Sequence, residues 1–229
     1  MTVVPTHLTR ATAVAAVAAG LIFVGVQINH PHLDATSVTT TEVAIRSSLK
    51  VLMAALAVVG ITGMYLRQVR QAGVLGLVGY LMMSTCYLII TCTSFAGGYI
   101  LPSVARTDPS YVNDVLTAAT NGHAAGDIGL LKYVLLVQAF TYLVGGLIFG
   151  IALFRARVLV RWATVLLAVG GLVSAALTVA PDAFYRLLAF PNGIAMVALG
   201  YSLWCTARSE STTPATIVSA ALHAPAGAE

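Results

Sequence analysis

Six apolar stretches separated by polar connections divide the chain between residues 11 and 205. Each stretch is close to, or above, the length of about 20 apolar residues that a transmembrane helix needs. The pattern predicts an all-α polytopic membrane protein, with residues 1–208 forming a bundle of six transmembrane helices. The predicted spans are residues 11–28, 43–66, 74–101, 128–154, 162–180 and 187–205. Residues 209–229, rich in Ser, Thr, Ala and Pro, are predicted to be a disordered cytoplasmic tail.

The connection between the third and fourth spans, residues 101–126, has a pattern of its own. Asp108 can cap a helix whose first residue is Pro109. Such a helix would place several apolar side chains on one face, namely Tyr111, Val112, Val115, Leu116 and Ala119. We therefore predict a short amphipathic surface helix between spans three and four. It either lies in the membrane interface or acts as a lid over the mouth of the bundle.

Composition supports a membrane protein and excludes several soluble classes. Apolar residues make up 59% of the chain and charged residues only 9%, whereas a soluble globular chain has about 25% charged residues. The net charge of +4 could suggest a nucleic-acid partner, but the basic residues lie at span ends rather than on one face of a soluble element. We therefore expect the lipid bilayer as a partner, and no nucleic acid.

The arginines predict an orientation. With the N-terminus inside, the cytoplasmic connections hold Arg10, Arg67, Arg70, Arg155, Arg157, Arg161 and Arg208, as the positive-inside rule requires. We therefore predict a multi-pass protein of a bacterial-type plasma membrane with both termini cytoplasmic. The first span could be read as a signal peptide, but no small-x-small cleavage pattern follows it, which favours a retained helix.

The carboxylates are gathered in the opposite connections. Six of the eight acidic residues lie in or beside three segments that this topology places outside: Asp34, Glu42, Asp108, Asp114, Asp127 and Asp182. An apolar chain that gathers its carboxylates at one face is polarised. The outer face is therefore where a functional site is expected.

The first candidate group lies at the outer end of the second span. Glu42, Arg46 and Lys50 follow one another at intervals of four residues, which stacks them along one stripe of a helix. Glu42 and Arg46 have the favourable order for an ion pair. Lys50 lies about two turns inside the span, where a charged side chain faces the bundle interior or a water-filled cavity by default. The alternative is that Lys50 snorkels to the headgroups.

The second candidate group is His123, Asp127 and Lys132. If the fourth helix begins before Gly126, His123 and Asp127 lie one turn apart and could transfer a proton. Each of the two helices then begins with an acid followed by a lysine, which indicates a shared polar pocket. The alternative is a pair of ordinary N-capping acids and snorkelling lysines.

The sequence predicts no metal site and leaves any cofactor unknown. His30, His32 and Asp34 are weak metal-ligand candidates, because their spacing fits no established structural zinc pattern and a solvated loop explains them as well. Cys86, Cys92 and Cys205 have no metal-binding spacing and are expected to be buried, unpaired thiols. The phosphate-binding, dinucleotide and hydrolase motifs of soluble enzymes are absent from the sequence.

The arrangement of spans, the arginine-marked inner turns and the final segment from Phe190-Pro191-Asn192-Gly193 to Leu203-Trp204 resemble small six-span bacterial integral membrane proteins of uncharacterised function. The resemblance covers residues 10–206. It implies a fold class and no activity.

Three classes of function remain open. The first is a protein that binds or moves a small molecule or ion in an outward-facing ionisable pocket made by Glu42, Arg46, Lys50, His123, Asp127 and Lys132; mixed charges suit an amphipathic or zwitterionic ligand, and the expected partner is an apolar or amphipathic small molecule. The second is a membrane-embedded enzyme, with Glu42 or Asp127 as general acid on a lipid or isoprenoid substrate. The third is an accessory or assembly subunit of a membrane complex. The small size also allows a homodimer.

Overall fold

The computed structural model describes residues 5–120, 123–176 and 189–212, and this part of the chain is helical, with no β-strand. The α-helices are α1 (Pro5–Gly25), α2 (Thr41–Arg67), α3 (Val69–Phe95), α4 (Leu101–Val104), α5 (Pro109–Ala119), α6 (Leu131–Ala156), α7 (Arg161–Ala176) and α9 (Ala189–Thr212). A short 3-10 helix, η1 (Ser37–Thr39), precedes α2, and a π-helix, η2 (Ala96–Ile100), separates α3 from α4.

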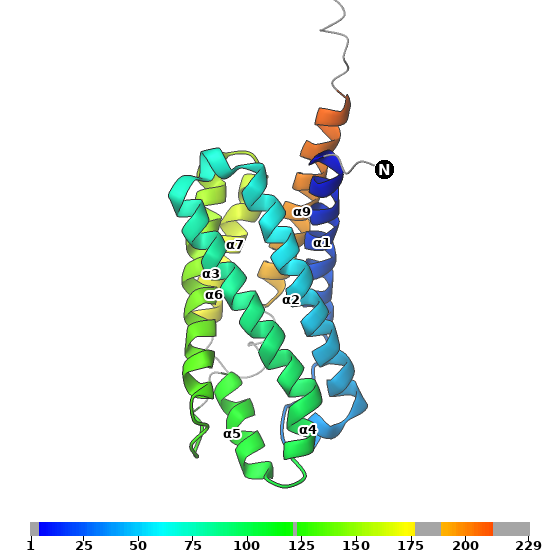
Figure 1. Ribbon diagram of the computed structural model, residues 1–229, viewed down its shortest axis with the longest axis vertical. Helices are drawn as coiled ribbons and strands as arrows, with labels where there is room; N and C mark the ends of the chain where they lie inside the picture. Colours follow the sequence, from blue (N-terminus) through cyan, green and yellow to red (C-terminus); the bar gives the residue numbers. More distant parts are fainter. Residues whose placement is uncertain (1–4, 121–122, 177–188, 213–229) are drawn as a thin grey trace, which may run out of the picture.

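The long helices form a closed ring. Helices α1, α2, α3, α6, α7 and α9 each pack against the next in chain order, and α9 packs back against α1 (Figure 1). Inward-facing apolar side chains fill the ring, and the bulkiest are Ile61, Met64, Met83, Tyr87, Phe149, Leu153, Leu167, Leu199 and Leu203. Short connections make α2 and α3, and α6 and α7, antiparallel neighbours, whereas η2, α4 and α5 lie between α3 and α6 in the chain.

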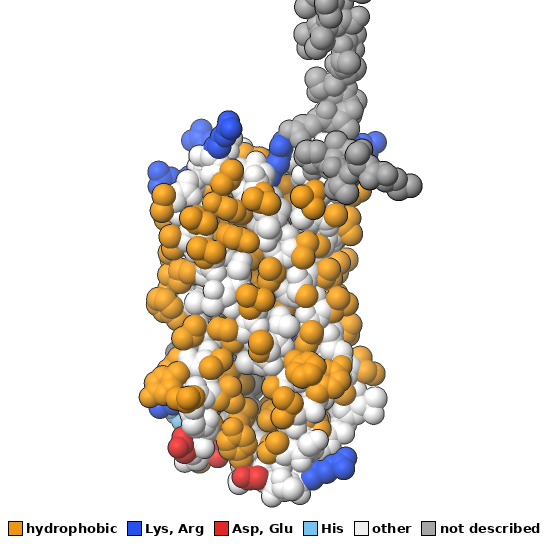
Figure 2. All heavy atoms as spheres, in the orientation of Figure 1, with side chains coloured by type: hydrophobic (Ala, Val, Ile, Leu, Met, Phe, Trp, Pro, Cys, Tyr) orange, Lys and Arg blue, Asp and Glu red, His pale blue; other side chains and the backbone are white. Residues whose placement is uncertain are grey.

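Four of the helical segments are long and apolar enough to cross a membrane: Thr6–Gly25, Thr41–Arg67, Val69–Val104 and Leu131–Ala156. A shorter apolar helical segment covers Arg161–Val173. On the face shown in Figure 2, apolar side chains cover the middle of the bundle and charged side chains lie at its two ends. The chain therefore has the features of a multi-pass membrane protein.

The helix boundaries differ from the prediction at several points. The fourth predicted span begins at Leu131 rather than residue 128, because Gly129 has a φ of 63° and its N–H donates to the Asp127 carboxylate at 2.8 Å in a turn. His123 and Asp127 therefore do not share a helical turn. The first span ends at Gly25 rather than residue 28, and α9 continues to Thr212, into the segment for which we predicted disorder. Residues 177–188 and 213–229 lie outside the described residues.

The predicted surface helix is confirmed as α5. The Asp108 carboxylate accepts a hydrogen bond from the Tyr111 N–H at 3.0 Å, so Asp108 is the N-cap and Pro109 the first helical residue. The helix does not lie loosely on the bundle. Its buried side chains belong to a second apolar cluster, separate from the main core, that consists of Val38, Val43, Leu101, Val112, Val115, Leu116 and Ile128. Helix α5 thus packs against the segments at one end of the ring.

Candidate functional site

The two ends of the bundle carry opposite charges. Five carboxylates lie at the end where α1 terminates and α2 and α6 begin: Asp34, Glu42, Asp108, Asp114 and Asp127. We call this the carboxylate end (the lower end in Figure 2). The arginines of the predicted inner connections lie at the opposite end, which we call the arginine end. Asp182 lies outside the described residues.

Four of these carboxylates hold the backbone of the connecting segments. Asp34 accepts from the N–H groups of Thr36 and Ser37 at 2.8 and 2.7 Å. Asp114 accepts from Ala125 and Gly126 at 2.8 and 3.1 Å, which ties α5 to the segment before α6. Asp108 and Asp127 make the cap and turn described above.

Hydrogen bonds from the backbone also lower the pKa of two of these carboxylates. N–H donation by Ser37 lowers the pKa of Asp34, and N–H donation by Tyr111 lowers the pKa of Asp108. Both carboxylates are therefore charged structural acceptors at neutral pH.

Arg46 clamps the end of α1 to α2. One terminal nitrogen of its guanidinium donates to the carbonyls of Val26 and Ile28 at 3.0 and 3.1 Å, and the other donates to the carbonyl of Asn29 at 3.1 Å. These three carbonyls belong to the segment that directly follows α1, and a cation is favourable near the C-terminal end of a helix. Only 18% of the Arg46 side chain is exposed.

The same guanidinium holds Glu42. Arg46 Nε and one terminal nitrogen each lie 2.9 Å from Glu42 Oε1, as the i, i+4 spacing predicted. Together with the three carbonyls, Glu42 Oε1 takes up four hydrogen bonds and one further ion-pair contact of the guanidinium. Oε2 of Glu42 accepts no hydrogen bond from any described residue, and 56% of the Glu42 side chain is exposed.

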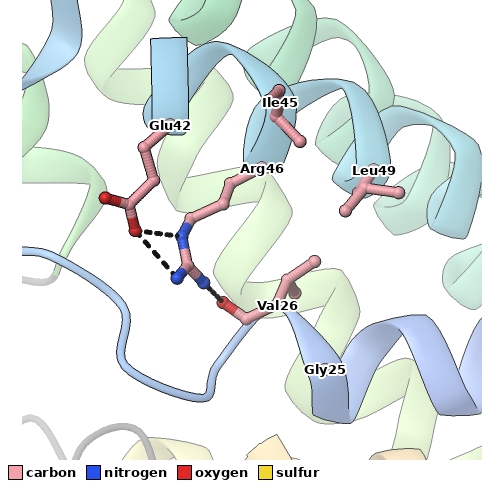
Figure 3. Close-up of a pocket in the computed structure, with 6 residues that line it drawn as sticks. All are labelled: Gly25, Val26, Glu42, Ile45, Arg46 and Leu49. Atoms are coloured by element: carbon pink, nitrogen blue, oxygen red, sulfur yellow. Dashed lines mark hydrogen bonds and ion pairs between the residues drawn. The ribbon is translucent and has the colours of Figure 1, made fainter. Parts of the chain in front are cut away.

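This pair borders a groove between α1 and α2. The groove has a volume of about 510 Å³ and is lined by Gly25, Val26, Glu42, Ile45, Arg46 and Leu49 (Figure 3). Ile45 and Leu49 are exposed residues of α2 and form its apolar wall with Val26. The groove therefore places one charged pair beside an apolar surface.

Lys50 lies one turn further along α2 and pairs with His30. Lys50 lies on the same side of α2 as the buried residues Met53, Ala54 and Ala57. We call this side, which faces the bundle interior, the inward stripe of α2. Lys50 Nζ lies 3.0 Å from His30 Nε2, while His30 Nδ1 lies 2.9 Å from the carbonyl oxygen of Pro31. A carbonyl can only accept, so Nδ1 carries a proton, and in the neutral tautomer Nε2 accepts from Lys50.

Two contacts on the other side of α2 had no signal in the sequence. Ser48 Oγ lies 2.7 Å from Tyr99 Oη in the π-helix. Ser47 is buried against Gly98, where a side-chain carbon would come within 2.6 Å of Ser47 Cβ. These contacts depend on the π-helix, and single-turn π-bulges are frequent at functional sites. No periodicity in the sequence indicated the extra residue that creates it.

The second predicted group lies apart from this groove. His123, Asp127 and Lys132 are exposed, and within the described residues no hydrogen bond or ion pair joins them to Glu42 or Arg46. His32 is exposed, and the described residues contain no group of three His, Cys, Asp or Glu side chains placed to hold a metal. Of the cysteines, Cys86 is buried as expected, whereas Cys92 and Cys205 are exposed on their helices.

Comparison with known proteins adds no assignment. No family model, curated protein or solved structure matches the chain. The site is therefore interpreted from its own geometry.

Proposed function

We propose that this chain is a six-span integral membrane protein of a bacterial-type plasma membrane with both termini cytoplasmic, and that its outer end binds a small amphipathic molecule in the groove between α1 and α2. The ring supports six spans, because α7 and α9 complete it and expose apolar side chains on its outside, among them Val165, Val169, Ile194 and Tyr201. The arginine end supports the orientation.

One observation carries the binding proposal. The Glu42–Arg46 pair borders a groove at the carboxylate end whose other lining is apolar. A ligand with a polar head group next to an apolar chain would match this combination of a charged pair and apolar side chains. Acid catalysis has less support, because Glu42 and Asp127 are exposed rather than enclosed in a cavity that would hold a substrate.

The test is saturable binding to the purified protein in neutral maltoside micelles. Leu49→Trp fills the groove, whereas Leu52→Trp places the same side chain on an exposed position of α2 that does not line it. Amphiphiles with dodecyl chains should raise the unfolding temperature of the wild type and of Leu52→Trp, but not of Leu49→Trp. Equal shifts in all three proteins would contradict binding in this groove.

A further inference from the structure

We infer that the groove selects a cationic head, so that the ligand is an amphiphile with an amine or quaternary ammonium group. This inference rests on the proposed function and adds the chemical class of the ligand. It follows from which polar atoms of the Glu42–Arg46 pair already form hydrogen bonds or ion-pair contacts and which do not.

In this groove an anionic head meets a guanidinium that is already engaged. Arg46 is the one basic lining residue among the described residues, and its guanidinium donates four hydrogen bonds to Val26, Ile28, Asn29 and Glu42 Oε1, with a second ion-pair contact to Oε1. Rotating Arg46 toward a ligand would leave the carbonyls of Val26, Ile28 and Asn29, in the segment after α1, without these donors. That cost opposes an anion, since an unpaired, partly buried carbonyl loses its hydrogen bond without replacement.

A cationic head has an acceptor in place. Oε2 of Glu42 takes no hydrogen bond from a described residue, and in Figure 3 it points away from Arg46 while Oε1 faces the guanidinium. Ile45 and Leu49 follow Glu42 along α2 at intervals of three and seven residues, on the same side of the helix. A chain that runs from an ammonium group at Glu42 along this side of α2 would pass over these two side chains.

The surroundings favour the same charge. The carboxylate end holds five described carboxylates, Asp34, Glu42, Asp108, Asp114 and Asp127, against four basic side chains, Arg46, Lys50, Arg106 and Lys132. The opposite end of the bundle is dominated by arginine. A cationic amphiphile is therefore attracted to the end that carries the groove and repelled from the other.

The experiment compares three head groups on one chain length: dodecyltrimethylammonium, dodecanoate and dodecanol, bound to the full-length protein in neutral maltoside micelles. The wild type should bind the ammonium compound saturably and more tightly than the other two. Glu42→Gln should weaken ammonium binding about tenfold or more, as loss of a charged partner does. Asp108→Asn is the matched control: it removes one negative charge from the same end but keeps an N-cap, and should bind like the wild type.

Ile45→Lys tests the inference without changing Glu42. It places an ammonium group at an exposed position of the groove wall, and should weaken dodecyltrimethylammonium while strengthening dodecanoate. Ammonium binding unchanged in both Glu42→Gln and Ile45→Lys would overturn the inference.

The outcomes separate the two proposals. If dodecanoate or dodecanol binds as tightly as the ammonium compound, and Leu49→Trp abolishes that binding, the cationic class is wrong while the groove remains a binding site. If none of the three compounds binds the wild type saturably, the proposed function and the ligand class both fail.

Discussion

Lys50 and His30 meet at 3.0 Å between Nζ and Nε2, although twenty positions of the chain separate them. The contact joins the inward stripe of α2 to the segment that follows α1. It also has a defined direction, because the Pro31 carbonyl accepts from the other ring nitrogen of His30.

The first prediction concerns this pair. A double-mutant cycle with His30→Phe and Lys50→Met should give a coupling energy of about 0.5–3 kcal/mol in the free energy of unfolding, because each change removes one side of a direct hydrogen bond. The cycle isolates the pair from any other contact of either residue. His32→Phe combined with Lys50→Met is the control and should be additive, since His32 is exposed. Additivity in both cycles would refute the contact.

The second prediction concerns the clamp at the end of α1. Arg46→Lys should lower the free energy of unfolding by about 1–3 kcal/mol, because an ammonium group cannot span the carbonyls from Val26 to Asn29 as the planar guanidinium does. Arg106→Lys, at an exposed position of the same end, should change it by less than about 0.5 kcal/mol. Chemical unfolding in mixed micelles measures both. Equal effects would show that charge alone, rather than the fork of hydrogen bonds, stabilises this junction.

These two contacts also show what the sequence could not predict. The i, i+4 spacing gave the Glu42–Arg46 pair, and the cap rules gave α5 from Asp108 and Pro109, because these features are local. Arg46 meets carbonyls 17 to 20 residues earlier in the chain, and Lys50 meets a histidine in an irregular segment. No periodicity encodes how such a segment turns back onto a helix.

The start of α6 was mispredicted for a related reason. The apolar run begins at Ile128, so hydrophobicity placed the helix there, but Gly129 adopts a left-handed conformation that Asp127 fixes through the N–H of Gly129. The turn that Asp127 stabilises therefore delays the start of α6 by three residues relative to the apolar pattern.

The third prediction concerns close helix packing. A side-chain carbon at Gly79 would lie 2.5 Å from the backbone nitrogen of Phe149 in α6, so Gly79→Ala should push α3 from α6 and cost about 1–3 kcal/mol. Gly97→Ala is the control, because nothing lies within 4 Å of the added carbon. Thermal unfolding should separate the two variants. A Gly79→Ala protein as stable as Gly97→Ala would contradict this helix contact.

The fourth prediction concerns acid. Folding lowers the pKa of Asp108 below its ordinary value of 3.8, so the cap contributes stability above that pH and loses it as the pH falls through the folded-state pKa. Asp108→Asn keeps the N-cap without a titrating group, and should show a smaller loss of unfolding temperature between about pH 5 and pH 2 than the wild type. Parallel pH profiles would indicate that this carboxylate does not contribute.

The last prediction concerns orientation, which decides whether the groove faces the outside. In a background without the three cysteines, a single cysteine replaces Thr117 on the exposed side of α5 or Arg70 at the arginine end. A membrane-impermeant maleimide added to intact spheroplasts should label Thr117→Cys and spare Arg70→Cys. After permeabilisation both should react, which controls for local accessibility. The reverse pattern would place the carboxylate end in the cytoplasm, and a ligand for the groove would then have to come from inside the cell.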